Sequence, residues 1–335
     1  MELGKKEREE LMIHRLCTIC EGLVKKRMVK VRSGKKLELH HCSNCSFDFF
    51  IHDPSEALSE NKLDGSRLKS AGLDVPTIEL DFHNGTQQSK SLLQEYLDHS
   101  DKSCNMLEIG CSIGYFLKLM KDFGCKPYGV EINASRSNYV NTILDIPCFT
   151  DLTQIEERGI KFKKIFLFYI LEYVPDPVVY LARLIDLLEV GGSLICVTPN
   201  AADTLIDIWD NKGFKDFFYD EYSVNYMSLQ TVKVILSKLN YTQADVVTRQ
   251  GYSFASHLNW YFTEKPKTTG IVGGDNFISD ISTQLIQTSK NKNLWEKQYS
   301  VATEIAELLQ KFDTDYRAIL EAEDCGNQIH FNINR

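Results

Sequence analysis

The sequence contains no run of 18 consecutive apolar residues, and residues 1–15 are mostly charged. The first absence argues against a membrane-spanning helix, and the charged start does not match the layout of an export signal. The net charge of −8 has the wrong sign for a chain that binds nucleic acid over its whole surface. These absences predict a soluble, cytoplasmic protein that has no membrane partner and for which nucleic acid is a disfavoured partner.

The composition is that of a globular protein with a substantial core. Of the 335 residues, 43% are hydrophobic and 25% are charged. This length accommodates two domains of ordinary size, or one large domain with an accessory module. The ten cysteines, in a chain without an export signal, are expected to be thiols or metal ligands rather than disulfides.

Four of the cysteines form two CxxC pairs, Cys17 with Cys20 and Cys42 with Cys45. Each pair places two thiolates on one tight turn, and two such turns complete a tetrahedron around Zn²⁺. The alternative, four incidental cysteines, is disfavoured by the paired spacing. His40 or His41 could replace one thiolate, although four cysteines are the simpler set. Because four thiolates leave no position for water, we expect a structural zinc ion in a zinc-ribbon module spanning residues 1–52.

The segment VKKRMVKVRSGKK, residues 24–36, has seven basic residues and no acidic one. Residues 24–31 and 37–41 are predicted strands, with a turn at Ser33 and Gly34. The hairpin could present a face that contacts phosphates, or it could be a solvated hairpin that keeps a small module soluble. The second interpretation is favoured, because no aromatic residue lies between the charges as a base-stacking surface requires.

After a polar linker or cap at residues 53–85, segments with helical and strand patterns alternate from Thr86 onward. Strands are predicted at 105–109, 127–132, 165–169, 193–198 and 241–250. Helices are predicted at 87–98 after an N-cap at Thr86, at 116–123 before a C-cap at Gly124, at 134–144, at 177–190 between an N-cap at Asp176 and Gly191-Gly192, and at 229–239. This alternation indicates a doubly wound α/β sheet in a domain of residues 86–335.

The stretch MLEIGCSIGYF, residues 106–116, places a glycine-containing turn after the first of these strands. It lacks two glycines of the dinucleotide fingerprint, which are replaced by Ser112 and Tyr115, and no Gly-Lys-Ser/Thr follows. A cofactor without phosphates demands less of the loop: close backbone approach at Gly110 and Gly114, and an acidic residue about 20 positions on for the ribose. Glu131 meets that requirement, and S-adenosylmethionine has that shape.

Three stretches, LEIGCSIGYFLKLMKDFGCKPYGVEIN, ILEYVPDP and LLEVGGSLICVTPN, resemble class I S-adenosylmethionine-dependent methyltransferases. More narrowly, the chain resembles bacterial members with an N-terminal CxxC…CxxC module, many of them linked to sugar or surface-polysaccharide modification. The resemblance implies a Rossmann-like seven-stranded sheet whose last strand is antiparallel. The cofactor-binding residues that it implies are Glu108, Gly110, Cys111, Ser112, Gly114, Tyr115, Phe116, Glu131, Ile132, Asp151, Leu152, Phe168 and Tyr169.

Several of these roles have a structural alternative. Glu108 could cap backbone amides, although its place at a strand tip favours contact with a ligand. Asp151 either binds adenine or is a solvated loop residue. Phe168 and Tyr169 either belong to the core or form a wall at the methionine end. The family often has Leu-Glu-His-Val after the fourth strand, whereas this chain has Tyr173 in place of the histidine, so no role can rest on that histidine.

The last ten residues, GNQIHFNINR at 326–335, alternate apolar and polar and are assigned to the final antiparallel strand. The insertion before it, residues 251–325, is too long for a hairpin and is expected to contain a helix at 295–312. It is a candidate acceptor-binding wall, with His257 as a base and Asn259 and Trp260 as contacts for a sugar. The alternative for each is packing, as a satisfied histidine and a core tryptophan in a helix.

Methyl transfer from a sulfonium requires alignment and exclusion of water, and a hydroxyl acceptor also requires a base. His257 and His83 are the candidate bases. The favoured function is methyl transfer to a sugar, nucleotide-sugar or related metabolite. One alternative is an RNA methyltransferase that holds RNA with the zinc ribbon and its basic hairpin. Another is a regulator that binds the cofactor without catalysis.

Overall fold

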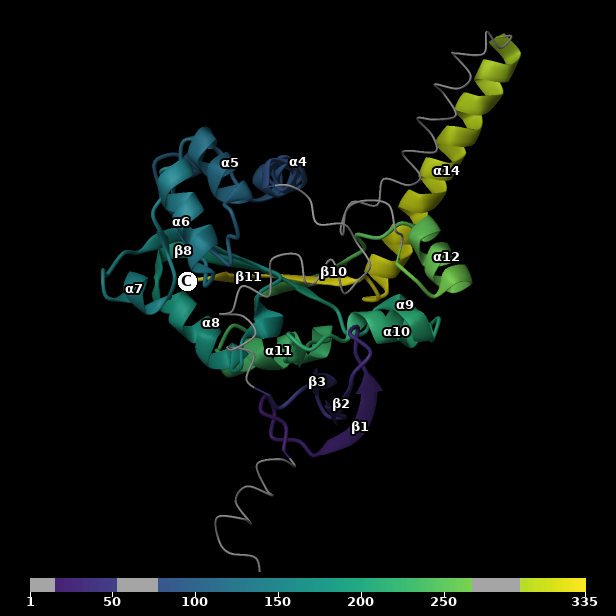
Figure 1. Ribbon diagram of the computed structural model, residues 1–335, viewed down its shortest axis with the longest axis horizontal. Helices are drawn as coiled ribbons and strands as arrows, with labels where there is room; N and C mark the ends of the chain where they lie inside the picture. Colours follow the sequence, from purple (N-terminus) through teal and green to yellow (C-terminus); the bar gives the residue numbers. More distant parts are fainter. Residues whose placement is uncertain (1–15, 53–77, 267–295) are drawn as a thin grey trace, which may run out of the picture.

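The computed structural model describes residues 16–52, 78–266 and 296–335. Within these residues the chain forms two sheets, one of seven strands in the order β10-β11-β8-β7-β4-β5-β6 and one of four strands in the order β1-β2-β3-β9. Figure 1 shows the large sheet nearly edge-on, with the small sheet below it. None of the helices in the described ranges is long and apolar enough to cross a membrane.

The large sheet confirms the predicted architecture. Strands β4 to β8 pair in parallel, and β11 is antiparallel to both of its neighbours, β8 and β10. The predicted final strand is therefore an interior strand of the sheet, between β8 and β10. The strands are β4 (Asn105–Ile109), β5 (Lys126–Val130), β6 (Cys148–Phe149), β7 (Phe162–Phe168), β8 (Leu188–Pro199), β10 (Asp245–Arg249) and β11 (Gln328–Asn334).

Helices cover both faces of this sheet, with α4, α5 and α6 on one side and α8 and α11 on the other (Figure 1). Side chains alternate along β4, so Met106 packs with Phe116 and Leu117 of α5 in one cluster, whereas Leu107 packs with residues of α8 and α11 in the other. The helices are α4 (Ile78–Tyr96), α5 (Tyr115–Phe123), α6 (Ala134–Ile143), α7 (Thr153–Glu156), α8 (Pro177–Asp186), α9 (Thr204–Asp207), α10 (Lys212–Phe218), α11 (Leu229–Lys238), α12 (Phe254–Thr263) and α14 (Glu296–Ala322).

Two helix ends form as the sequence predicts, and a third does not. Gly124 ends α5 with φ 104°, and the Asp176 carboxylate accepts a hydrogen bond from the Val179 amide at the start of α8. However, α8 ends at Asp186 rather than at residue 190. Leu188 instead begins β8, where it is buried and pairs with Phe162, so the two glycines lie inside a strand. Burial in the sheet overrides the helical pattern here.

Helix α4 begins at Ile78, so Thr86 lies inside the helix and is not its N-cap. The last residues of the predicted linker, 78–85, are helical as well, while 53–77 lie outside the described residues. The ring of Phe82 packs near Tyr115 and Tyr139, with centroids 5.8 and 6.5 Å apart. These apolar contacts with the sheet domain stabilise the additional helical turns.

The small sheet contains the predicted hairpin. We use the name ribbon for residues 16–52 as a whole. Its strands are β1 (Val24–Lys30), β2 (Lys36–Cys42) and β3 (Phe47–Phe49), and the sheet is completed by β9 (Asn225–Tyr226) from the other segment of the chain. The Phe50 amide also donates to the Val224 carbonyl at 3.0 Å. The ribbon is therefore integrated into the large domain by backbone pairing rather than attached by a linker alone.

The predicted insertion contributes α12 and α14, while residues 267–295 lie outside the described part of the chain. Helix α14 corresponds to the helix predicted at 295–312 and continues to Ala322. It projects away from the sheet in Figure 1.

Candidate active site

The loop between β4 and α5 is held in an unusual backbone conformation. Gly110, Ser112 and Gly114 have φ values of 73°, 51° and 86°. A Cβ added at Gly110 would lie 2.0 Å from Cδ1 of Ile170, and one at Gly114 would lie 2.7 Å from Cδ1 of Leu144. Both glycines are therefore required by close packing and by positive φ, and they bring the backbone to the carboxyl edge of the sheet.

Glu131 lies directly after β5 and binds this loop. Its carboxylate is buried and accepts hydrogen bonds from the Ser112 and Asn133 amides, each at 2.9 Å. Each carboxylate oxygen retains capacity for a further bond. The predicted pair, an acidic residue at the second strand and a glycine turn at the first, is thus in direct contact, while the adjacent Ile132 is 46% exposed.

Glu108, at the tip of β4, is a buried carboxyl group with an unused oxygen. Burial raises its pKa to about 8, the charges of Cys148 and Glu131 add to the rise, and a hydrogen bond from the Leu117 backbone opposes it. Among the described residues its Oε2 has no hydrogen-bond partner. The carboxyl group therefore caps a backbone amide, as the structural alternative expects, while Oε2 is left without a donor among the described residues.

The two aromatic residues at the end of β7 differ in their environment. Phe168 packs against Phe116 and Tyr96, with ring centroids 5.7 and 6.2 Å apart, so it belongs to the core. Tyr169 is 42% exposed and has φ 56°, a strained backbone conformation for a residue other than glycine. Such strain is concentrated at functional sites. The next residue, Ile170, packs against Gly110 of the glycine loop.

Other residues predicted to bind the cofactor have mainly structural contacts. The Asp151 carboxylate accepts from the Thr153 amide at 2.6 Å, which lowers the pKa of Asp151, and its neighbour Leu152 is buried. Phe116 is buried in the core. Cys111 is also buried, and its Sγ lies 3.6 Å from Sγ of Cys148, a contact that the sequence does not indicate.

Within the insertion 251–325, the predicted acceptor wall, the three candidate residues lie on the packed helix α12. His257 is fully buried, with Nδ1 2.6 Å from the Tyr316 hydroxyl and Nε2 3.2 Å from the Gln250 amide. The Asn259 side chain donates to the Lys265 carbonyl, and Trp260 is buried against Phe214 and Phe217. The packing alternative describes all three: His257 has no ring nitrogen available to act as a base, and Asn259 and Trp260 hold α12 in place.

The second candidate base, His83, is exposed on α4. It lies within the helix rather than ahead of it, because α4 starts at Ile78. Its neighbour Phe82 packs near Tyr115, which follows the glycine loop, so this part of α4 lies next to the candidate site.

The four cysteines of the two CxxC pairs are brought together as predicted. Their Sγ atoms all lie within 4.8 Å of one another, with 3.6 Å between Cys17 and Cys45 and 3.4 Å between Cys20 and Cys42. Zinc–sulfur bonds of about 2.3 Å in a tetrahedron place the sulfurs about 3.8 Å apart, so the cluster has the size for Zn²⁺. The hydrogen bond between Cys17 and Cys45 lowers the pKa of Cys17 and raises the pKa of Cys45.

Neither neighbouring histidine belongs to this cluster. The His40 ring stacks on Phe49 with centroids 5.2 Å apart, and Nδ1 of His41 lies 2.6 Å from Asp48. The turn that carries Cys42 and Cys45 is held by α11, because the Cys45 carbonyl accepts a hydrogen bond from the hydroxyl of Thr231 at 2.8 Å. The candidate metal centre is therefore formed by four cysteines and braced by α11.

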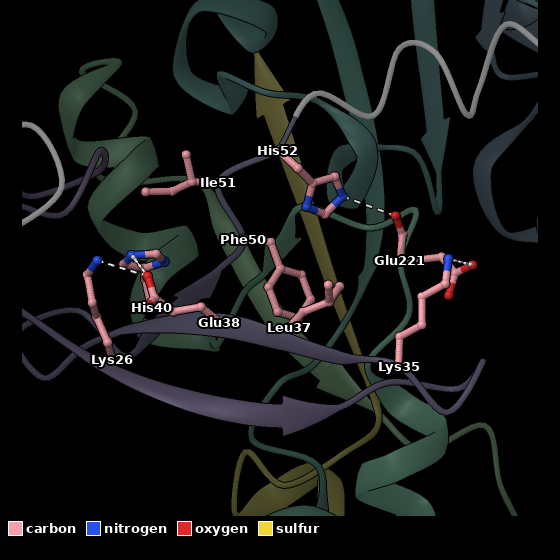
Figure 2. A pocket seen from close by; sticks show the side chains of 9 residues that line it. All are labelled: Lys26, Lys35, Leu37, Glu38, His40, Phe50, Ile51, His52 and Glu221. Carbon is pink, nitrogen blue, oxygen red and sulfur yellow. Dashed lines mark hydrogen bonds and ion pairs between the residues drawn. The ribbon is translucent and has the colours of Figure 1, made fainter. Parts of the chain in front are cut away.

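The basic residues of the hairpin are largely engaged within the protein. Figure 2 shows Lys26 and Lys35 reaching Glu38 and Glu221 around a cavity of about 440 Å³. Lys30 pairs with Asp216, Arg27 pairs with Asp48, and Arg32 donates to the Phe217 carbonyl and lies over the Phe217 ring. Five of the seven positive charges thus have partners, two of them in α10, which neither interpretation from the sequence anticipated.

Residues 82–246 match the family described as a methyltransferase domain. No curated protein matches the chain. Among solved structures, the chain is similar to a SAM-dependent methyltransferase from Archaeoglobus fulgidus, with 15% identity, a TM-score of 0.46, and coverage of 77% of this chain and 97% of that one. It is also similar to a cyclopropane-fatty-acyl-phospholipid synthase-like protein from Lactobacillus casei, with 12% identity, a TM-score of 0.43, and coverage of 78% and 94%. A third similar structure is magnesium protoporphyrin IX methyltransferase from Synechocystis, with 14% identity, a TM-score of 0.40, and coverage of 59% and 89%.

Proposed function

Because residues 82–246 match a family described as a methyltransferase domain, we propose that the protein transfers the methyl group of S-adenosylmethionine to a small-molecule acceptor. The acceptor class that we propose is a sugar, a nucleotide-sugar or a related metabolite. The observation that carries the cofactor assignment is the buried Oε2 of Glu108, which lacks a donor among the described residues beside a glycine loop and the acid of β5.

These residues fit S-adenosylmethionine group by group. The carboxylate of Glu131 suits the ribose hydroxyls, and the closely approaching backbone of Gly110 to Gly114 suits the methionine portion. Glu108 would accept a hydrogen bond from a donor of the bound cofactor. Tyr169, exposed at the end of β7, would form a wall of the site, and the backbone near Asp151 and Leu152 would border the adenine.

When bound, the cofactor supplies an activated methyl group and its own leaving group. The contribution of this chain is therefore to orient the two reactants and to exclude water. The loop geometry, fixed by Glu131 and by the packing at Gly110, holds one reactant in a defined position. His83 is the candidate base for a hydroxyl acceptor, since it is exposed on α4 next to the residues that pack on Tyr115.

The four-cysteine cluster would hold a structural Zn²⁺ ion. Four thiolates complete its coordination, so the metal has no open position for a substrate or for water. The cluster joins the ribbon to α11 through the Cys45 carbonyl, which is consistent with a stabilising role.

The engaged hairpin charges favour a small acceptor over RNA. A protein that binds RNA through a basic face needs those charges free to replace counterions at phosphates. Here Lys26, Lys30 and Lys35 have acidic partners inside the protein.

A regulator without catalysis differs from the proposed enzyme in binding the cofactor without turnover.

A label-transfer assay tests the proposal. The zinc-loaded protein is incubated with S-adenosylmethionine labelled in its methyl group and with a cell extract, and the products are separated into metabolite and RNA fractions. We expect label in the metabolite fraction. Label that is found in RNA and is lost on nuclease treatment would refute the proposed acceptor class, and cofactor binding without label in either fraction would identify a regulator.

The matched variants are Glu131→Ala, within the site, and Glu157→Ala, at an exposed position after α7. Loss of a charge-assisted contact to the ribose should weaken cofactor binding by about tenfold or more in the first variant. The second variant should bind as the unmodified protein does, as measured by isothermal titration calorimetry.

A further inference from the structure

A cavity of about 810 Å³ lies between the ribbon and the large sheet, apart from the glycine loop. On one side it is lined by β1, β2 and β3 of the ribbon, and on the other by α9, by α11 and by Ala201 and Ala202. These two alanines follow the end of β8, and β8 is parallel to β7 and through it to β4. The cavity therefore opens at the same edge of the sheet as the candidate cofactor loop, where open α/β sheets bind ligands.

The ribbon wall of this cavity is the polar end of one sheet face. Lys25 pairs with His41 and His41 with Asp48 across neighbouring strands, so their side chains lie side by side. Further along the same face, Val29 and Leu39 pack in the cluster that contains Tyr219 and Tyr226. The face thus changes from apolar to polar where it reaches the cavity.

A hydrogen-bonded network fixes this polar end. The buried Asp48 carboxylate lies 2.9 Å from the Tyr219 hydroxyl, 2.6 Å from Nδ1 of His41 and 3.4 Å from Arg27. Arg27 also donates to the Tyr219 hydroxyl at 3.2 Å. A buried carboxylate costs free energy unless it is fully satisfied, so its partners are held in defined positions at the cavity wall.

The cavity is also lined by charged groups of both signs. Lys25 on β1 and Lys233 on α11 face it from opposite walls, and neither has an ion pair within the described ranges. Two carboxylates also line it, Asp207 at the end of α9 and Asp324 just after α14, likewise without an ion pair among the described residues. The cavity therefore offers both ammonium groups and carboxylate hydrogen-bond acceptors.

We propose that this interface cavity binds a small molecule that carries both a phosphate group and several hydroxyl groups. Lys25 and Lys233 meet the phosphate, because ammonium groups form strong charge-assisted bonds to it. Asp207 and Asp324 accept hydrogen bonds from the hydroxyls and reject a second anionic group. If this molecule is the methyl acceptor, the inference rests on the proposed function. If it is an effector, the inference does not depend on the proposed function.

Calorimetric titration of the full-length, zinc-loaded protein with glucose 1-phosphate tests this site. We expect glucose 1-phosphate to bind more tightly than either inorganic phosphate or glucose, since only the first offers both groups. The double variant Lys25→Glu/Lys233→Glu should bind it at least about tenfold more weakly. The control Lys36→Glu/Lys126→Glu changes the net charge equally at exposed positions outside the cavity and should bind it normally.

Absence of saturable binding of glucose 1-phosphate, or an equal loss in both double variants, would overturn the inference. Titration of the same samples with S-adenosylmethionine separates this failure from that of the proposed function, because the cavity variants leave the cofactor loop intact. In the label-transfer assay, a raised KM for the acceptor with unchanged kcat identifies the ligand as the acceptor. A changed kcat at constant KM identifies it as an effector.

Discussion

The ribbon and the glycine loop of residues 110–114 differ in how their polar groups are satisfied. In the ribbon, most basic side chains have acidic or carbonyl partners from the ribbon itself or from α10. Beside the loop, the buried Oε2 of Glu108 lacks a partner within the described residues. The region that is richest in charge is thus internally neutralised, whereas the less charged region retains an unsatisfied group.

This difference separates the roles of the two regions. Satisfied charges and backbone pairing with β9 are typical of a structural interface, whereas an orphaned buried acceptor is typical of a binding site. A charge-rich segment in a sequence does not by itself locate a ligand. The experiments below test this division, beginning with the largest expected effect.

Removal of zinc tests whether the ribbon is structural. Because β9 and α11 contact the ribbon, we expect chelation to destabilise the whole described fold, by several kcal/mol in the free energy of unfolding. Scanning calorimetry before and after chelation, with recovery on adding zinc, measures this change. Cys45→Ser should behave like the chelated protein, and the control Cys325→Ser, outside the cluster, should not. Unchanged melting after metal removal would contradict the structural assignment.

A pair of glycine substitutions compares the two regions directly. Gly110 and Gly34 both have positive φ, but a Cβ at Gly110 would meet Ile170, whereas at Gly34 nothing lies within 4 Å. Both Gly→Ala variants should lose about 1–2 kcal/mol of stability from the backbone conformation. Only Gly110→Ala should also lose cofactor affinity, by about 100-fold, as loop displacement disrupts the site. Equal affinities by calorimetric titration would show that the loop does not hold the cofactor.

The carboxyl group of Glu108 provides a test that depends on pH. Its pKa is raised from 4.5 to about 8, so its favourable contribution to stability is complete below pH 4.5 and is lost as the pH rises through about 8. Glu108→Gln should remove this loss and make the cofactor-free protein more stable at pH 9, by on the order of a few kcal/mol.

Urea unfolding across this pH range measures the effect, with Glu157→Gln as the control at an exposed position. The same Glu108→Gln variant should bind S-adenosylmethionine more weakly, by about tenfold. Parallel pH profiles for the variant and the unmodified protein would refute the raised pKa.

Features set by neighbouring residues could be predicted from the sequence. The Asp176 cap, the Gly124 helix end and the four-cysteine cluster each depend on a few residues at fixed spacing. The pairing of the glycine turn with Glu131 also follows from the order of strands in a parallel sheet.

Features set by contacts distant in the sequence could not be predicted in this way. The strand β9 has only two residues, Asn225 and Tyr226, and it pairs with β3, which lies far away in the sequence. No local pattern therefore predicts it. The sequence around His257 and Trp260 is compatible with either a binding wall or a packed helix. Only the burial of these side chains in the structure distinguishes the two. Two of the five partners of the basic hairpin lie in α10, far along the chain, so the sequence does not indicate that these charges are engaged.

The smallest effect concerns a single ion pair of the ribbon. Lys30 pairs with Asp216 at 3.2 Å, but its side chain is 50% exposed, so Lys30→Ala should lower the free energy of unfolding by less than about 1 kcal/mol. A double-mutant cycle with Asp216→Ala measures the coupling, and the cycle includes Lys212→Ala because Lys212 shares the same carboxylate. If this face bound RNA, the loss of one lysine would reduce the salt dependence of RNA affinity by about one counterion. Because the charge is engaged within the protein, we expect no such change; a reduced salt slope for Lys30→Ala would show that the Lys30 side of the ribbon binds RNA.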